Sequence, residues 1–188
     1  MMVGCSFNAS LETLTDNNTT PDVTIIENVE IDMITHHHMY DNMDRGNHDY
    51  FDKTLAIDTN IKVPEISRGD VVFFDNEAGE KDISRVVALP GEKFKITKGQ
   101  IYINGKKLEA FYGTAHRVGL DMENYFKKMD NEGNEYDKKV MMEVFETSIK
   151  EINLSDDEYY LIGDDWLQSK MMILKEDKFI GKVVGYAK

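Results

Sequence analysis

Residues 83–108 read ISRVVALPGEKFKITKGQIYINGKKL, and this segment carries clear signals of strands and turns. It opens with an apolar run over residues 83–89, which predicts a strand that ends at Pro90-Gly91, because proline fixes φ and glycine accepts a positive φ. It closes with two alternating runs on either side of Asn104-Gly105, a pattern that predicts a tight β-hairpin over residues 100–108. The stretch therefore indicates short antiparallel strands joined by tight turns.

Similar signals recur along the rest of the chain. Apolar or alternating runs at residues 71–74, 158–162 and 179–186 predict further strands. Between the hairpin and the last of these strands lies a polar segment, residues 113–155, in which residues 120–129 have helical spacing. We therefore expect a mainly β fold of short antiparallel strands that carries a polar, partly helical insertion.

The composition excludes several classes of protein. The chain has 188 residues, of which 41% are hydrophobic and 30% charged, and this excludes a wholly disordered chain. Its net charge of −13 makes nucleic acid an unsuitable partner. The longest apolar runs, such as residues 71–74, are far shorter than the roughly 20 residues of a membrane-spanning helix.

The N-terminus carries the single cysteine, Cys5, within MVGCS at residues 2–6. A small residue followed by cysteine resembles a bacterial lipobox, which implies a lipid anchor at Cys5 and a flexible polar tether over residues 1–22. An ordinary buried cysteine is the alternative. We expect residues 23–188 to form the domain, with a strand over residues 23–34 because apolar residues alternate there.

Four histidines, His36, His37, His38 and His48, follow that strand among several aspartates. If the strand continues, His36 and His38 point to the same side. Imidazole and carboxylate groups are competent zinc ligands, so a metal site at His36, His38 and His48 is one functional alternative. No known zinc spacing is matched, and a solvated polar loop without a metal is the preferred interpretation.

Three segments, in order, resemble the type I signal peptidases, membrane-anchored Ser/Lys endopeptidases that remove signal peptides. RGDVVFF at residues 68–74 is similar to the family's RGDIVV segment, and ISRVVALPGE at residues 83–92 is similar to its VKRVVGLPGD segment. YLIGDD at residues 160–165 resembles its Gly-Asp-Asn box. The resemblance extends over residues 23–188 and implies the family's β fold.

The resemblance also locates the catalytic dyad, and both of its positions are substituted. In the family, a serine attacks the scissile carbonyl and a lysine takes its proton. His38 stands at the serine position and Ser84 at the lysine position. Arg85, Asp164 and Ser169 stand where the family supports its cleft, and we expect Arg85 to pair with Asp164 because a buried guanidinium needs a carboxylate.

These substitutions imply a signal peptidase I-like protein that is catalytically inactive. We expect it to bind or assist exported polypeptides, or their signal-peptide segments, at the extracytoplasmic face of the bacterial cytoplasmic membrane, held there by a lipid anchor. The enzyme alternative is an active signal peptidase with an inverted pair, in which Ser84 attacks and His38 is the base. No cofactor is expected.

Overall fold

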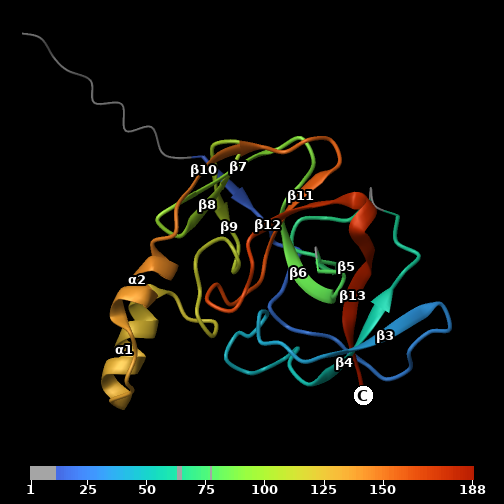
Figure 1. The fold of residues 1–188 in the computed structure, drawn as a ribbon, viewed down its shortest axis with the longest axis horizontal. Helices are drawn as coiled ribbons and strands as arrows, with labels where there is room; N and C mark the ends of the chain where they lie inside the picture. Colours follow the sequence, from blue (N-terminus) through green and yellow to red (C-terminus); the bar gives the residue numbers. More distant parts are fainter. Residues whose placement is uncertain (1–11, 63–64, 77) are drawn as a thin grey trace, which may run out of the picture.

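The structure is a computed structural model that describes residues 12–62, 65–76 and 78–188. Its strands form two mainly antiparallel sheets, and two helices lie beside the smaller one (Figure 1). The mainly β fold predicted from the sequence is thus confirmed. No helix in the described ranges combines the length and the apolar character needed to cross a bilayer.

The larger sheet has the strand order β12-β11-β6-β5-β13-β4-β3, and β2 pairs with β13. Its strands are β2 (Ile25–Ile26), β3 (Met33–His38), β4 (Lys53–Asp58), β5 (Val71–Asp75), β6 (Lys81–Ala88), β11 (Glu158–Ile162), β12 (Met172–Lys175) and β13 (Phe179–Ala187). The 3-10 turn η2 (Glu176–Lys178) leads into β13. β13 holds this sheet together, because it is hydrogen-bonded to β5, β4 and β2 along its length.

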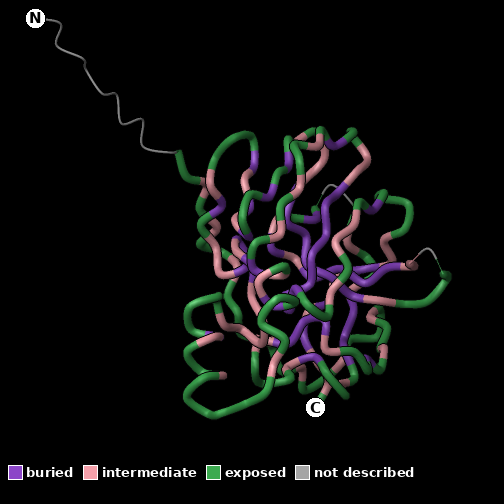
Figure 2. Tube along the Cα trace, turned by 60° about the vertical axis from the view of Figure 1, so that its left-hand side comes forward, coloured by how far each residue is buried: buried purple, intermediate pink, exposed green. Residues whose placement is uncertain are grey.

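Central strands of this sheet come from the most apolar runs of the sequence. The first four residues of β5 and the last six of β6 are buried, so both faces of these strands are covered. Strands covered on both faces need continuous apolar runs rather than alternation, which is the pattern found there. The predicted strands at residues 71–74, 83–89, 158–162 and 179–186 are confirmed, and Figure 2 shows the buried backbone running through the middle of the molecule.

The smaller sheet has the order β1-β9-β8-β7-β10. Its strands are β1 (Thr13–Thr15), β7 (Lys93–Thr97), β8 (Gln100–Ile103), β9 (Lys106–Glu109) and β10 (Ile149–Asn153). Asn104 (φ 51°) and Gly105 (φ 79°) connect β8 to β9, and two positive φ values are what a tight hairpin turn of this kind needs. The hairpin predicted over residues 100–108 is confirmed.

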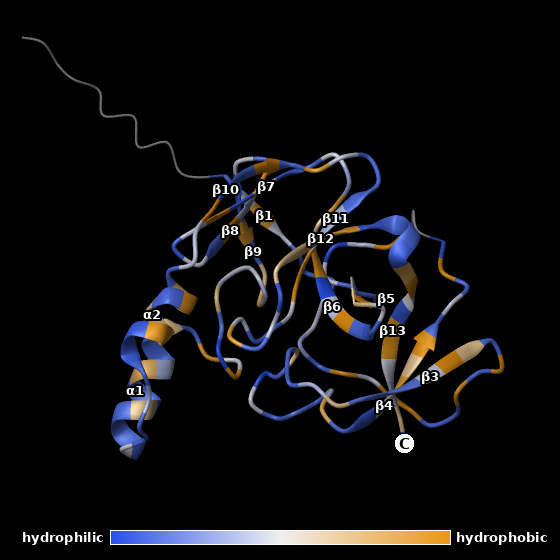
Figure 3. Cartoon of the chain, in the orientation of Figure 1, coloured by the Kyte–Doolittle hydropathy of each residue, from blue (hydrophilic) through white to orange (hydrophobic). Residues whose placement is uncertain are grey.

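The segment expected as an insertion contains more structure than the sequence pattern predicts. α1 (Met122–Glu132) confirms the helical spacing; Asp121 caps its start and Gly133, in the left-handed conformation, ends it. α2 (Lys138–Phe145) buries only Met141 and Phe145, which lie one turn apart. Two apolar positions are too few to distinguish a helix from a loop in the sequence. Figure 3 shows hydrophobic residues of α1 and α2 as orange bands among hydrophilic residues in blue. β10 pairs with β7, so the end of the segment belongs to the smaller sheet.

The expectation of a flexible tether up to residue 22 is wrong for its second half. β1 pairs in parallel with β9, and the Asp16 carboxylate accepts a hydrogen bond of 2.6 Å from the Tyr112 hydroxyl. From Glu12 onward the chain is part of the fold, because its polar groups find partners on other elements. Cys5 lies outside the described residues, so its lipid attachment stays a prediction.

The strand expected over residues 23–34 is also wrong in its bounds. Only β2 and the first two residues of β3 fall within that range. Between them the backbone turns, with the Met33 N–H donating to the Glu30 carbonyl at 3.1 Å, and Ile31 is fully exposed. The alternation of apolar residues in this segment therefore does not mark one face of a continuous strand.

Candidate functional site

The site starts from the last residue of β3. His38 is completely buried, whereas His36 on the same face is half-buried, and the two ring centroids lie 6.5 Å apart. The expectation that these two histidines share a side is therefore confirmed. Burial disfavours the imidazolium, so the pKa of His38 lies below its ordinary value of 6.5 and the ring is neutral near neutral pH.

Asn42 fixes the tautomer of His38. The Asn42 Nδ2 donates a hydrogen bond of 2.8 Å to the Ile83 carbonyl, so its Oδ1 is the atom that faces His38 Nε2 at 3.0 Å. An amide oxygen can only accept, so His38 Nε2 carries the hydrogen. His38 Nδ1 is then left with a free lone pair, and it has no hydrogen-bond partner within residues 12–62, 65–76 and 78–188.

Ser84 and Ser169 present two further buried polar atoms without partners. Ser84 lies on β6 and is 3% exposed, and neither its Oγ nor that of Ser169 makes a hydrogen bond to any residue that the structure describes. Buried hydroxyls normally find partners, so three unsatisfied atoms, counting His38 Nδ1, are unusual for one small region. Because Ser84 Oγ and His38 Nδ1 both lack a partner, they are not hydrogen-bonded to each other.

Gly163 brings these segments together. A Cβ on Gly163 would lie 2.3 Å from the Asn42 carbonyl oxygen and 2.6 Å from the Ser169 Cβ, so only glycine allows this approach. The antiparallel register of β11 and β6 pairs Ile162 with Arg85, and extending it by one residue places Gly163 opposite Ser84. The loop after β3, the middle of β6 and the loop after β11 therefore converge here.

Arg85, the residue after Ser84, anchors the convergence. Its guanidinium donates two hydrogen bonds of 2.6 Å to Asp164, one to each carboxylate oxygen, and a third of 2.7 Å to the Gly69 carbonyl. Burial alone lowers the pKa of Arg85, but the charge of Asp164 and its hydrogen bonds more than offset this, so the pKa lies above its ordinary value. The pair expected from the sequence is present, and it locks β6 to the loop after β11.

A cavity of about 160 Å³ opens beside the convergence. Its lining includes the sequence neighbours of all three unsatisfied residues: Tyr40 and Asn42 follow His38, Asp82 precedes Ser84, and Gln168 and Lys170 flank Ser169. The remaining lining residues are Asn76, Glu80 and Lys81. The cavity is therefore a polar cleft next to His38 and Ser84, the residues that the resemblance assigns to the dyad positions.

Lysine side chains near the cleft do not rebuild a Ser/Lys pair. Lys81 pairs with Asp75, and Lys170 is exposed at the rim. The hydroxyls of Ser84 and Ser169 make no hydrogen bond to any described group, so no ammonium group is in hydrogen-bond contact with them. Arg117 pairs instead with Asp165, on the loop that follows β11.

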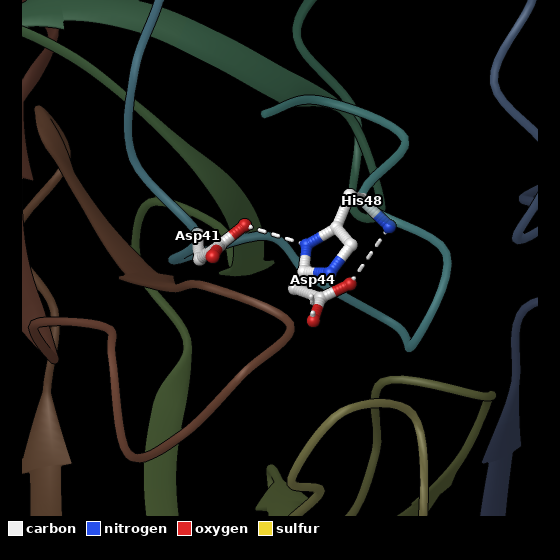
Figure 4. A group of neighbouring side chains, drawn as sticks. All are labelled: Asp41, Asp44 and His48. Carbon is white, nitrogen blue, oxygen red and sulfur yellow. Dashed lines mark hydrogen bonds and ion pairs between the residues drawn. The ribbon is translucent and has the colours of Figure 1, made fainter. Parts of the chain in front are cut away.

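The metal site considered at His36, His38 and His48 is wrong in its composition. The structure brings His48 together with Asp41 and Asp44, and one possible ligand atom from each lies within 4.8 Å of the others (Figure 4). His36 and His38 are separated from His48 because β3 ends at His38 and a long loop carries His48 onward.

Hydrogen bonds within the loop account for this second cluster. His48 Nδ1 lies 3.0 Å from an Asp41 oxygen, a contact that raises the pKa of His48. Asp44 accepts hydrogen bonds from the backbone N–H groups of Gly46, at 2.8 Å, and His48, at 3.0 Å. Both aspartates therefore have a role in shaping the loop.

Two residues of the site are not predicted from the sequence. The resemblance identifies Asn42 only as a substituted position and gives it no role. Its hydrogen bonds to His38 and Ile83 could not be foreseen, because Asn42 and Ile83 are 41 residues apart in the sequence. Asp82 shares a face of β6 with Ser84, as residues two apart on a strand do, and this alternation is the signal that could have identified it.

Comparisons with known proteins agree with the motifs. A family model described as signal peptidase, peptidase S26, matches residues 19–185. Signal peptidase I U of Bacillus subtilis (strain 168) is 30% identical over 120 residues, which cover 61% of this chain and 54% of that protein. Signal peptidase I of Rickettsia akari (strain Hartford) is 34% identical over 88 residues, 46% of this chain and 32% of that protein.

Probable signal peptidase I-2 of Synechocystis sp. (strain ATCC 27184 / PCC 6803 / Kazusa) is 29% identical over 104 residues, 45% of this chain and 48% of that protein. Among solved structures, a signal peptidase I from Enterococcus faecalis V583 is similar, with a TM-score of 0.41 and 18% identity over 63% of this chain and 96% of that chain. The chain spans about half the length, or less, of these curated relatives.

Proposed function

The chain belongs to the signal peptidase family, peptidase S26, and we propose that it binds exported polypeptides in the polar cleft without cleaving them. One observation carries the proposal: the two residues at the dyad positions, His38 and Ser84, are buried and not hydrogen-bonded to each other. A serine hydroxyl is a weak nucleophile unless a base within hydrogen-bond reach takes its proton. Among the described residues no base lies within hydrogen-bond reach of Ser84, and its side chain is buried from solvent.

Peptide binding does not need the dyad. β3 is hydrogen-bonded to β4 on one side, and within the described residues no strand pairs with its other side. An extended peptide can add to such an edge through main-chain hydrogen bonds. β3 ends at His38 and the chain continues into Tyr40 and Asn42 of the cleft, so a peptide along this edge would reach the cleft directly.

The location of the protein is part of the proposal. The named relatives are signal peptidases, and binding of exported polypeptides places this chain at the extracytoplasmic face of the membrane. A lipid on Cys5 would supply the anchor. The mass of the protein extracted from membranes of its host tests this, because an unmodified N-terminus contradicts the anchor.

Incubation of the full chain with a labelled signal-peptide substrate in detergent tests the function. We expect fluorescence anisotropy to show binding while mass spectrometry shows an intact peptide after many hours. The Ser84→Ala variant should bind equally well, because Ser84 Oγ makes no hydrogen bond that the substitution removes. Failure of any peptide to bind would reject the proposal.

An active enzyme with an inverted pair is the second candidate, and one observation favours it. His38 Nδ1 has a free lone pair in the neutral ring, as a general base must, and Ser84 Oγ has no competing partner. Closure of the site around a substrate would have to bring the two atoms into contact. Cleavage after a small residue that is lost in Ser84→Ala would establish this candidate and displace the first.

A further inference from the structure

We propose that the polar cleft takes a basic side chain of the bound polypeptide, with Asp82 as its counter-charge. This inference rests on the proposed function and specifies the ligand class of the same site. Every side chain that lines the cleft is polar or charged, apart from the ring of Tyr40. Such a lining presents charged and hydrogen-bonding groups, which a basic side chain can pair with and a small aliphatic side chain cannot.

Asp82 lacks a cation of its own. Its Oδ1 accepts hydrogen bonds from the Ile83 N–H at 2.8 Å and from Asn42 Nδ2 at 3.3 Å, and both donors are neutral. The neighbouring Lys81 is engaged by Asp75 instead. Within the described part of the chain no lysine, arginine or histidine lies within ion-pair distance of Asp82.

The surroundings of Asp82 favour the binding of a cationic group from a ligand. Burial raises its pKa above the ordinary 3.8, although its two hydrogen bonds and the more distant charge of Lys170 act in the opposite direction. A half-buried carboxylate without a partner is costly, and a charged donor that enters the cleft would relieve that cost. The hydrogen bonds of the protein therefore stabilise the negative charge of Asp82 in the cleft only in part.

Other charges around the cleft do not reverse this preference. Glu80 and Lys170 are both exposed at the rim, where opposite charges largely cancel and water screens them. Lys81 is neutralised by Asp75. Asp82 is thus the charge that a side chain inside the cleft would meet.

A series of peptides with one changed position tests the inference on the unaltered protein. The probe is a labelled signal-peptide segment in which lysine, norleucine or glutamate replaces one residue at a time, and the readout is Kd from fluorescence anisotropy. At one position we expect lysine to bind about tenfold more tightly than norleucine, because its ammonium group gains a charge-assisted hydrogen bond to Asp82. Glutamate should bind most weakly there.

Two variants locate the effect. Asp82→Asn should abolish the preference for lysine over norleucine. Glu80→Gln removes one negative charge from the exposed rim and should leave most of this preference intact. Equal Kd values for lysine and norleucine at every position, or equal effects of the two variants, would overturn the inference while leaving peptide binding intact.

A second measurement does not depend on a peptide. n-Butylammonium should raise the melting temperature of the unaltered chain more than butanol does at the same concentration, and Asp82→Asn should remove the difference. If no peptide binds but this difference is seen, the proposed function fails and the preference of the cleft for a cation stands. If the amine and the alcohol act alike, this preference is rejected.

Discussion

Arg85 and Asp164 are joined by two parallel hydrogen bonds of 2.6 Å across 79 residues of sequence. The side chains of Arg85 and Asp164 are 4% and 1% exposed, so water cannot take the place of either partner. It fixes the loop after β11 against β6, and this loop carries Gly163 and Ser169 to the cleft. The pair is thus a positioning device for the site.

Asp164→Asn should destabilise the fold strongly. The change leaves the Arg85 guanidinium buried without its counter-charge, and loss of one partner of a buried pair costs about 3–5 kcal/mol. Urea unfolding followed by the fluorescence of Trp166, the single tryptophan, measures the loss. Glu27→Gln is the control, because its partner Lys188 is exposed and such pairs contribute about 0–1 kcal/mol. A loss below that of the control would contradict a structural role for the pair.

Stability should fall as the pH drops below about 6.5, and His38 should account for part of the fall. Burial lowers the pKa of His38 in the folded chain, so the unfolded chain binds the proton more readily. One group of this kind contributes at most about 1.4 kcal/mol per pH unit. His38→Gln should therefore flatten the decline between pH 7 and pH 5 in urea unfolding curves.

His37→Gln is the matched control for that experiment, because His37 neighbours His38 but is exposed. Burial also lowers the pKa of His36 and His116, so some decline should remain in His38→Gln. The raised pKa values of Asp82 and Asp165 act with the opposite sign, since the folded chain holds those protons more tightly. An unchanged slope in His38→Gln would show that His38 does not titrate as its burial implies.

Local signals in the sequence predict the parts of the fold that local chemistry decides. The hairpin at Asn104-Gly105 follows from two residues that tolerate positive φ, and β5 and β6 follow from apolar runs. α2 could not be predicted, because only Met141 and Phe145 of its residues are buried. β1 could not be predicted either, since its polar segment is held by Asp16 and Tyr112, which are 96 residues apart.

The candidate site, like the fold, can be predicted from the sequence only in part. The resemblance places His38, Ser84 and Arg85 because each lies beside a motif. It does not reveal the bridge from His38 through Asn42 to Ile83, nor the contact of Asn42 with Gly163, because these depend on how separate loops meet. Sequence patterns identify which positions matter, whereas the unsatisfied atoms and the cleft arise from tertiary packing.

Gly163→Ala should weaken peptide binding as well as stability. Its methyl group would press on the Asn42 carbonyl and on Ser169, and both flank the cleft. Gly113→Ala is the matched control, because its Cβ would lie 2.3 Å from the Leu108 carbonyl in the smaller sheet, away from the cleft. Each change should cost about 1–3 kcal/mol in urea unfolding, as overpacking does. Only Gly163→Ala should raise the Kd of the signal peptide. A similar rise in both variants would show that the effect on binding is not specific to Gly163.

Gly69→Ala should release the N-terminal segment. Gly69 and Gly79 both have positive φ, 90° and 77°, so alanine is strained by about 1 kcal/mol at either position. At Gly69 the added Cβ would also lie 2.0 Å from Thr19 Oγ1 and 2.7 Å from an Asp16 oxygen, whereas at Gly79 it meets nothing within 4 Å. Hydrogen exchange at the Thr19 amide should accelerate in Gly69→Ala and stay unchanged in Gly79→Ala. Equal protection in the two variants would show that the segment adapts to the methyl group.

The position of β13 in the larger sheet governs when the chain can finish folding. β13 is synthesised after every other strand of the domain, yet it lies between β5 and β4 and pairs with β2, so that Tyr186 meets Ile25. Until β13 has been synthesised, β5 and β4 each leave a sheet edge open, and open edges invite aggregation. We therefore expect the incomplete chain to be exposed to aggregation for longer than a domain whose early strands pair with one another.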